Sequence, residues 1–89
     1  MRLATSESVI LNLLARAGPS YGLELVAASR GRLKRGGIYV TLGRMEEKGL
    51  VTSAAAESGR RLYRPTALGE RALLAMRVFA GDLKIGSTA

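Results

Sequence analysis

Residues 36–51 read Gly-Gly-Ile-Tyr-Val-Thr-Leu-Gly-Arg-Met-Glu-Glu-Lys-Gly-Leu-Val, and this stretch decides the fold that we expect. The apolar residues that recur in it at helical spacing are Ile38, Leu42 and Met45. This spacing predicts a helix over residues 37–48 with one buried side. The other side carries Val40, a large apolar residue, and Gly43, which weakens a helix by roughly 1 kcal/mol relative to Ala. A side so sparsely charged suits a helix that approaches another molecule closely.

The charge of the chain is concentrated around this stretch. The 89 residues include 14 Lys and Arg against seven Asp and Glu, a net charge of +7. Residues 30–64 hold nine of the bases and three of the acids, a net +6. Such a field indicates a polyanionic partner. Composition alone leaves DNA, RNA and an anionic membrane open, as well as a basic face that only aids solubility.

The residue types that are absent exclude several classes of function. The chain has no His and no Cys, so a Ser-His or Cys-His hydrolase, a disulfide and a Cys metal site are all excluded. We therefore expect no enzyme activity, no metal and no cofactor. The N-terminus does not resemble a signal peptide, and no window approaches 18 uninterrupted apolar residues. We expect a cytoplasmic protein that does not enter a membrane.

Two helices are predicted before the basic loop at residues 30–37. Their expected ranges are 6–17 and 20–29, with Ser6 and Ser20 as the N-caps. Gly22, early in the second helix, is expected to let another part of the backbone come close. Tyr21 has two interpretations, a half-buried core aromatic or a hydroxyl that donates to a phosphate. Leu33 is expected to pin the basic loop to the core.

A β-hairpin is predicted after residue 49. Residues 50–56 and 61–64 form its strands, and Gly59 in the turn is free to take a positive φ. Arginines gather at the tip and on the return strand. They could contact a nucleic acid, or they could simply protect an exposed strand edge from aggregation.

The last predicted helix runs from Thr66, its N-cap, to about residue 81 or 82 and is apolar nearly all round. The stripe expected to pack on the domain is Leu68, Ala72, Ala75 and Phe79. The apolar residues then left facing water are Leu73, Leu74, Met76, Val78 and Ala80. A small monomer rarely tolerates such a surface, so we expect a homodimer to cover it. A membrane-lying helix is the rival, but too few cations line its polar side.

The predicted order of elements is three helices, a hairpin and a fourth helix. The fold class is mainly α with a small β-hairpin (α+β), that is, a winged helix-turn-helix followed by a C-terminal dimerisation helix. The expected divisions are a DNA-binding domain over residues 1–65, the dimerisation helix over 66–83 and a flexible tail over 84–89.

Several segments in one register resemble the PadR-like family of transcriptional regulators. These segments are Ile10-Leu11-Asn12-Leu13-Leu14, Gly18-Pro19-Ser20-Tyr21-Gly22, Gly36 to Leu42, Met45 to Val51, Glu57 to Thr66, and Gly69. The resemblance covers roughly residues 9–75. It implies a homodimeric regulator that binds double-stranded DNA, most often as a repressor.

The chain departs from the family pattern at two positions in the third helix. The family usually has Ser at the position of Gly37 and Pro at that of Val40, so this is where we expect the chain's own specificity. The C-terminal region is also shorter than in many members. The chain has no Trp, so a pocket that stacks flat aromatic drugs is not expected, and the sequence identifies no other effector.

The candidate DNA-binding residues are Tyr21, Lys34, Arg35, Gly37, Tyr39, Val40, Thr41, Arg44, Arg60, Arg61 and Arg64. The candidate dimer-interface residues are Leu73, Leu74, Met76, Val78, Phe79 and Ala80. Among the DNA-binding candidates, Arg44 suits bidentate contact with guanine, and Val40 suits contact with a thymine methyl group. An alternative function is a winged-helix protein–protein module whose basic face binds an acidic partner such as the transcription machinery. RNA or single-strand binding is disfavoured because interleaved aromatic residues are lacking.

Overall fold

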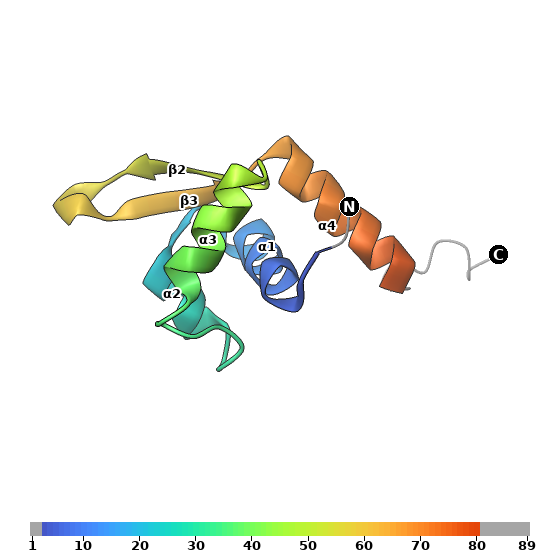
Figure 1. The fold of residues 1–89 in the computed structure, drawn as a ribbon, viewed down its shortest axis with the longest axis horizontal. Helices are drawn as coiled ribbons and strands as arrows, with labels where there is room; N and C mark the ends of the chain where they lie inside the picture. The colour runs from blue at the N-terminus through green and yellow to red at the C-terminus, as the bar shows by residue number, and fades with distance from the viewer. Residues whose placement is uncertain (1–2, 81–89) are drawn as a thin grey trace.

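A computed structural model describes residues 3–80, with the side chains of residues 3–78 (Figure 1). The helices of this part are α1 (Thr5–Ala17), α2 (Gly22–Ala28), α3 (Ile38–Glu47) and α4 (Ala67–Ala80). The strands are β1 (Ser20–Tyr21), β2 (Val51–Ala55) and β3 (Arg61–Pro65), and a single 3-10 turn, η1 (Glu57–Gly59), joins β2 to β3. The sheet is antiparallel with the order β1-β3-β2. The predicted α+β winged-helix fold is confirmed.

The hairpin and the last helix extend in different directions from the helical body. In Figure 1, β2 and β3 project to one side and α4 to the other, with α3 between them. The turn at the hairpin tip contains two consecutive residues of positive φ, Ser58 at 60° and Gly59 at 72°. The positive φ expected at Gly59 is therefore confirmed. The predicted tail, residues 84–89, and the expected end of the last helix lie outside the described residues.

The start of α1 differs from the prediction. The helix begins at Thr5, so Ser6 lies inside its first turn and the prediction of Ser6 as N-cap was wrong. Instead, the carboxylate of Glu7 accepts a hydrogen bond from the N–H of Ala4 at 2.9 Å. That bond satisfies one of the N–H groups that a helix start leaves free.

The start of α2 also differs. Ser20 was predicted to cap this helix, but Ser20 and Tyr21 form β1 and pair with β3. The Ser20 hydroxyl donates to the carbonyl of Gly18 at 2.9 Å, so it is not a cap. The Tyr21 N–H is bound instead by the carboxylate of Glu24, three residues on, at 2.8 Å. A two-residue strand depends on its distant partner rather than on local sequence, which is why the helical pattern was extended too far.

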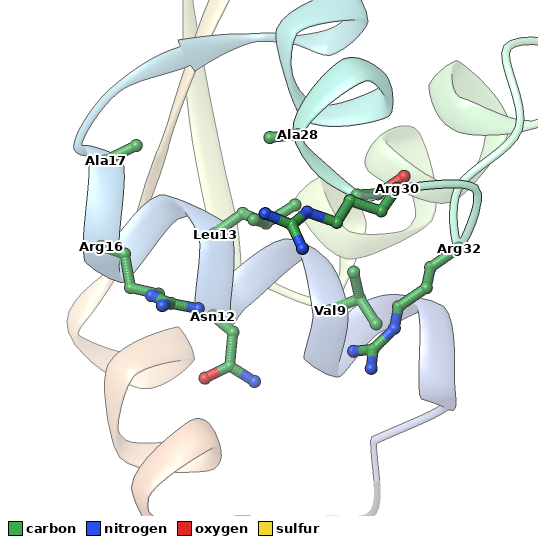
Figure 2. A pocket seen from close by; sticks show the side chains of 9 residues that line it. Val9, Asn12, Leu13, Arg16, Ala17, Ala28, Arg30 and Arg32 are labelled. Carbon is green, nitrogen blue, oxygen red and sulfur yellow. The ribbon is translucent and has the colours of Figure 1, made fainter.

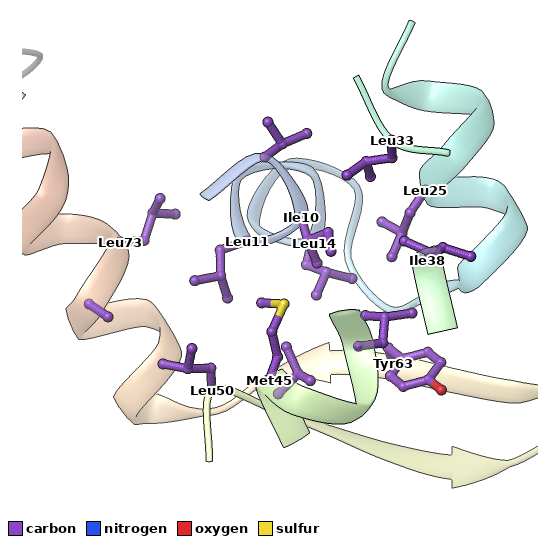
Figure 3. Packing of buried hydrophobic residues seen from close by; sticks show 14 residues of the cluster. Ile10, Leu11, Leu14, Leu25, Leu33, Ile38, Met45, Leu50, Tyr63 and Leu73 are labelled. Atoms are coloured by element: carbon purple, nitrogen blue, oxygen red, sulfur yellow. The ribbon is translucent and has the colours of Figure 1, made fainter. Parts of the chain in front are cut away.

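One apolar core joins the helices to the sheet (Figure 3). Its fully buried large side chains are Ile10, Leu11, Leu14, Leu25, Ile38, Leu42, Met45, Leu50 and Val51. Leu33 is buried as well, so the expected pin of the basic loop is confirmed. Its N–H donates to the hydroxyl of Ser29 at 2.9 Å, which adds a polar anchor beside the apolar one.

The rotation of α4 about its axis differs from the prediction. The residues that face the core are Ala72 and Leu73, which are buried, and Met76, which packs partly against it. The predicted exposure of Leu73 was therefore wrong, while Leu68 and Ala75 of the expected inner stripe are exposed. Gly69 explains this rotation, because its α-carbon lies against the carbonyl of Leu50. Residues three, four and seven positions after Gly69 share its side of the helix and so face the core.

We predict that Gly69→Ala destabilises the fold. A Cβ at Gly69 would lie 2.1 Å from the Leu50 carbonyl oxygen, so α4 would have to move away from the core. Overpacking of this kind costs about 1–3 kcal/mol. Gly43→Ala is the matched control because nothing lies within 4 Å of its added Cβ, and Ala in a helix stabilises by roughly 0.5–1 kcal/mol relative to Gly. Urea unfolding of both variants measures the contrast, and equal free energies of unfolding would contradict the account.

Candidate nucleic-acid interface

Helix α3 has the two sides that its sequence predicts. Ile38, Leu42 and Met45 are buried beneath it. Tyr39 and Val40 are 52% and 57% exposed, although both are large hydrophobic side chains. The exposed side therefore offers apolar and aromatic contact area with little charge.

The ring of Tyr39 lies against the first turn of α2. A Cβ at Gly22 would sit 2.7 Å from the nearest ring carbon of Tyr39, so only glycine leaves room for the ring. The sequence predicted that backbone comes close at Gly22, but it is the side chain of Tyr39 that approaches this glycine. The contact is made by the far end of the Tyr39 ring and its hydroxyl, while about half of the residue's surface stays accessible.

Arg60 of the hairpin lies over the ring of Tyr21. The central carbon of its guanidinium is 3.9 Å from the ring centroid, a cation–π contact. Tyr21 therefore supports a cation, a role that neither interpretation of its sequence position included. Tyr21 and Arg60 lie next to each other because β1 pairs with β3, where Tyr21 is opposite Leu62.

Arg61 of β3 is linked to α3 through the hydroxyl of Ser53. Its Nε–H donates to the hydroxyl of Ser53 at 2.9 Å, and that hydroxyl donates to the carboxylate of Glu46 at 2.7 Å. Ser53 and Glu46 were not among the predicted site residues. Their contact depends on the register of β2 with β3 and on the packing of α3, which local sequence does not reveal.

The loop before α3 exposes Lys34 and Arg35, as expected of a basic loop. The N–H of Gly37 donates to the Lys34 carbonyl at 3.2 Å, and the Thr41 hydroxyl donates back to the Gly37 carbonyl at 3.1 Å. No atom lies within 4 Å of a Cβ built on Gly37, so the backbone is open there. The beginning of α3 is thus accessible beside two cations.

Arg44 and Arg64 are the remaining predicted cations, and both are exposed. For the side chains of residues 3–78, the structure records no hydrogen bond or ion pair of the Arg44 guanidinium. Arg44 therefore differs from Arg60 and Arg61, whose guanidinium groups already contact neighbouring side chains.

An ion pair between a half-exposed lysine and a buried glutamate joins the C-terminal end of α3 to α1. The ammonium of Lys48 is 2.6 Å from the carboxylate of Glu7, whose side chain is only 6% exposed. Burial alone would raise the pKa of Glu7. The hydrogen bonds from Lys48 and from the Ala4 N–H, with the charges of Lys48 and Arg44, outweigh burial and lower that pKa below its ordinary value of 4.5. The ionised pair therefore favours the folded state.

We predict that this contribution to stability disappears in acid. Because folding lowers the pKa of Glu7, the stabilisation is complete above pH 4.5 and is lost as the pH falls through the folded-state pKa. Glu7→Gln should cost roughly 1–3 kcal/mol at neutral pH. The variant and the wild type should converge in urea unfolding at low pH. Glu57→Gln, exposed at the hairpin tip, is the control, and a pH-independent effect of Glu7→Gln would contradict the assignment.

A second group of arginines lines a hollow of about 920 Å³ between α1 and the end of α2 (Figure 2). Arg16 of α1 contributes to it, as do Arg30 and Arg32, which follow α2. Among the residues that the structure describes, no carboxylate lines it, and none of the predicted DNA-binding residues does. Arg30 and Arg32 of the basic segment 30–64 contribute to it, and Arg32 also lines a smaller hollow with Lys34 and Gly37 at the start of α3.

Within residues 3–80, no helix is both long enough and apolar enough to cross a bilayer. In the same part of the chain, no group of three acidic side chains is arranged to hold a metal ion.

Comparison with solved structures gives close likenesses over nearly the whole chain. A PadR family transcription regulator from hypervirulent Clostridium difficile is 26% identical with a TM-score of 0.71, over 97% of this chain and 100% of that one. A transcriptional regulator from Clostridium thermocellum is 23% identical with a TM-score of 0.67, over 98% of this chain and 95% of that one. A MarR family regulator is 24% identical with a TM-score of 0.78, over 97% of this chain but 58% of that one. The latter two likenesses show the fold alone.

Comparison of sequences assigns the family. No curated protein matches the chain at a significant level. The model of the transcriptional regulator PadR-like family matches residues 10–75, which include the larger part of α1, all elements from β1 to β3 and about the first two thirds of α4. This match agrees with the winged-helix fold and with the Clostridium difficile regulator. The chain therefore belongs to the PadR-like family of transcriptional regulators.

Proposed function

We propose that this chain binds double-stranded DNA in a sequence-specific manner as a homodimer, and that it represses transcription by occupying a promoter. The observation that carries the proposal is the exposed side of α3, where Tyr39, Val40 and Arg44 lie on a helix whose other side is packed in the core. The function needs no catalytic step and no cofactor. We expect it to be exercised in the cytoplasm.

In this proposal, α3 enters the major groove and reads the bases. Arg44 donates two hydrogen bonds to one guanine, and Val40 contacts a thymine methyl group. Tyr39 and Thr41 contact bases or nearby phosphates, and the open backbone at Gly37 lets the duplex come close. Support comes from the exposure of this side of α3 and from the absence of recorded partners for the Arg44 guanidinium within residues 3–78.

The surrounding cations position the protein on the phosphate backbone. Lys34 and Arg35 lie in the loop before α3, and the hairpin supplies a further set of arginines. The proposed phosphate contacts are Tyr21, Lys34, Arg35, Arg60, Arg61 and Arg64. Contacts of this kind fix the register on the duplex without reading its sequence.

The proposed dimer forms through α4, and we divide the chain at residues 1–65, 66–83 and 84–89 accordingly. Leu74 and Val78, one helical turn apart, are 52% and 55% exposed. Leu73 and Met76 are left out of this surface, because Leu73 is buried in the core and Met76 packs against it. The side chains of Phe79 and Ala80 lie outside the described residues. Two copies joined here would read half-sites about one DNA turn, ~34–36 Å, apart.

A gel shift with genomic fragments at about 150 mM salt, in the presence of competitor DNA, tests the proposal. Retention of specific fragments at this salt concentration is the expected result. If no duplex is retained, the protein–protein module with an acidic partner replaces DNA binding as the explanation of the basic surface.

A further inference from the structure

Ser53 of β2 connects α3 to the other strand of the hairpin, β3. Its hydroxyl accepts from the Arg61 Nε–H at 2.9 Å and donates to the Glu46 carboxylate at 2.7 Å. The three residues come from β2, β3 and α3. One hydroxyl therefore joins the two elements that are proposed to contact DNA.

The strand register explains why these side chains meet. Ser53 is opposite Tyr63, and Ala55 is opposite Arg61, so Ser53 and Arg61 lie on the same face of the sheet as the buried Tyr63. Glu46 lies near this face, where its charge adds to the effect of burial in raising the pKa of Tyr63. The link from α3 to β3 thus runs along the inner edge of the hairpin.

Glu46 and Arg61 are joined only through the hydroxyl. Within the described residues, Lys48 and Glu7 form the one ion pair, so Arg61 and Glu46 are not directly paired. A serine hydroxyl can donate one hydrogen bond while it accepts another, which an alanine at this position could not do. Because a guanidinium is planar, a bond at Nε also restricts the plane in which its Nη groups lie.

We propose that Ser53 is a positioning residue for Arg61, which it orients so that the Nη groups are ready to bind a DNA phosphate. This inference rests on the proposed function and assigns one of its residues a role. Arg60 is held differently, by the ring of Tyr21, so the two neighbouring arginines are positioned by separate partners. Glu46 acts through Ser53 and stabilises the orientation of its hydroxyl.

The experiment compares Ser53→Ala with Ser53→Thr, which keeps the hydroxyl, and with Thr52→Ala. Thr52 is exposed and is the next residue along β2, on the opposite face of the sheet, so it is the matched control. The first measurement needs no DNA. It follows the Arg61 Nε–H signal by ¹⁵N NMR. This proton should be protected from exchange with solvent in the wild type, in Ser53→Thr and in Thr52→Ala. It should exchange rapidly in Ser53→Ala.

The second measurement is the affinity for a selected duplex as a function of salt. Ser53→Ala should weaken binding by about 3- to 10-fold, the effect of ordering one long side chain. The salt dependence should stay unchanged because the charge of Arg61 remains, whereas Arg61→Ala should reduce the slope by about one. Ser53→Thr should restore the wild-type affinity.

Three results would overturn the proposal. An Nε–H signal that stays protected in Ser53→Ala would show that the hydroxyl does not hold Arg61. An exposed signal with wild-type affinity would show that the orientation does not serve binding. If the wild type binds no duplex, the proposed function is refuted, and with it the role of Ser53 in DNA binding. The NMR result would then still show whether Ser53 holds Arg61.

Discussion

Replacing Arg44 with Ala is expected to weaken binding to the selected operator by about 10- to 100-fold, and binding to random DNA far less. A bidentate contact with guanine is worth about 1–3 kcal/mol of discrimination, and this variant removes it. Arg44 is the exposed cation of α3, and it has no recorded partner among the side chains of residues 3–78. Its guanidinium can therefore meet a base without first breaking a contact within the protein.

Fluorescence anisotropy with the operator and with a scrambled duplex measures both affinities under one salt condition. Arg71→Ala is the control, because Arg71 is an equally exposed arginine on α4. Its effect should be small and the same for both duplexes. If Arg44→Ala weakens both duplexes equally, Arg44 binds phosphate rather than a base, and the proposed reading of guanine is wrong.

The second large effect is expected from the double variant Leu74→Glu, Val78→Glu. Both side chains are more than half exposed on one side of α4, and charges there would be buried unpaired in the proposed dimer. We expect a monomer in sedimentation experiments. A monomer contacts only one half-site, so operator binding should weaken by roughly 100-fold or more, the gain in affinity that simultaneous binding of two half-sites supplies.

Leu23→Glu is the matched control for this variant. Leu23 is 44% exposed on α2 and not on α4, so this variant introduces a charge of the same sign at another exposed apolar site. It should leave the oligomeric state unchanged. If the α4 double variant sediments as the wild type does, α4 does not form the dimer through this surface.

The helical spacing of α3 was sufficient to predict its structure. Ile38, Leu42 and Met45 are all buried, and the exposure expected at Val40 is present. Here the local pattern and the tertiary packing agree, because a helix with one apolar side can bury only that side. The predicted hairpin is present for a similar reason, since Gly59 takes the positive φ that its turn requires.

Features that depend on distant partners were not predictable from the sequence. β1 exists only because β3 lies beside it, so Ser20 could be taken for a helix cap. The rotation of α4 follows from the contact of Gly69 with the Leu50 carbonyl, which placed Leu73 in the core instead of at the surface.

The candidate site shows the same division. The exposure of its arginines could be predicted from their number and positions. The partners of Arg60 and Arg61 could not, because Tyr21 and Ser53 reach them only through the register of the assembled sheet. Sequence reasoning thus predicted that these arginines are exposed but not the contacts that orient their side chains.

Selection of bound genomic fragments by the wild-type protein, followed by sequencing, tests the central claim most directly. Sequence-specific binding by a homodimer predicts that the retained fragments share an inverted repeat, with half-sites about one DNA turn apart. Retained fragments with no common sequence, or the retention of none above the competitor background, would contradict it.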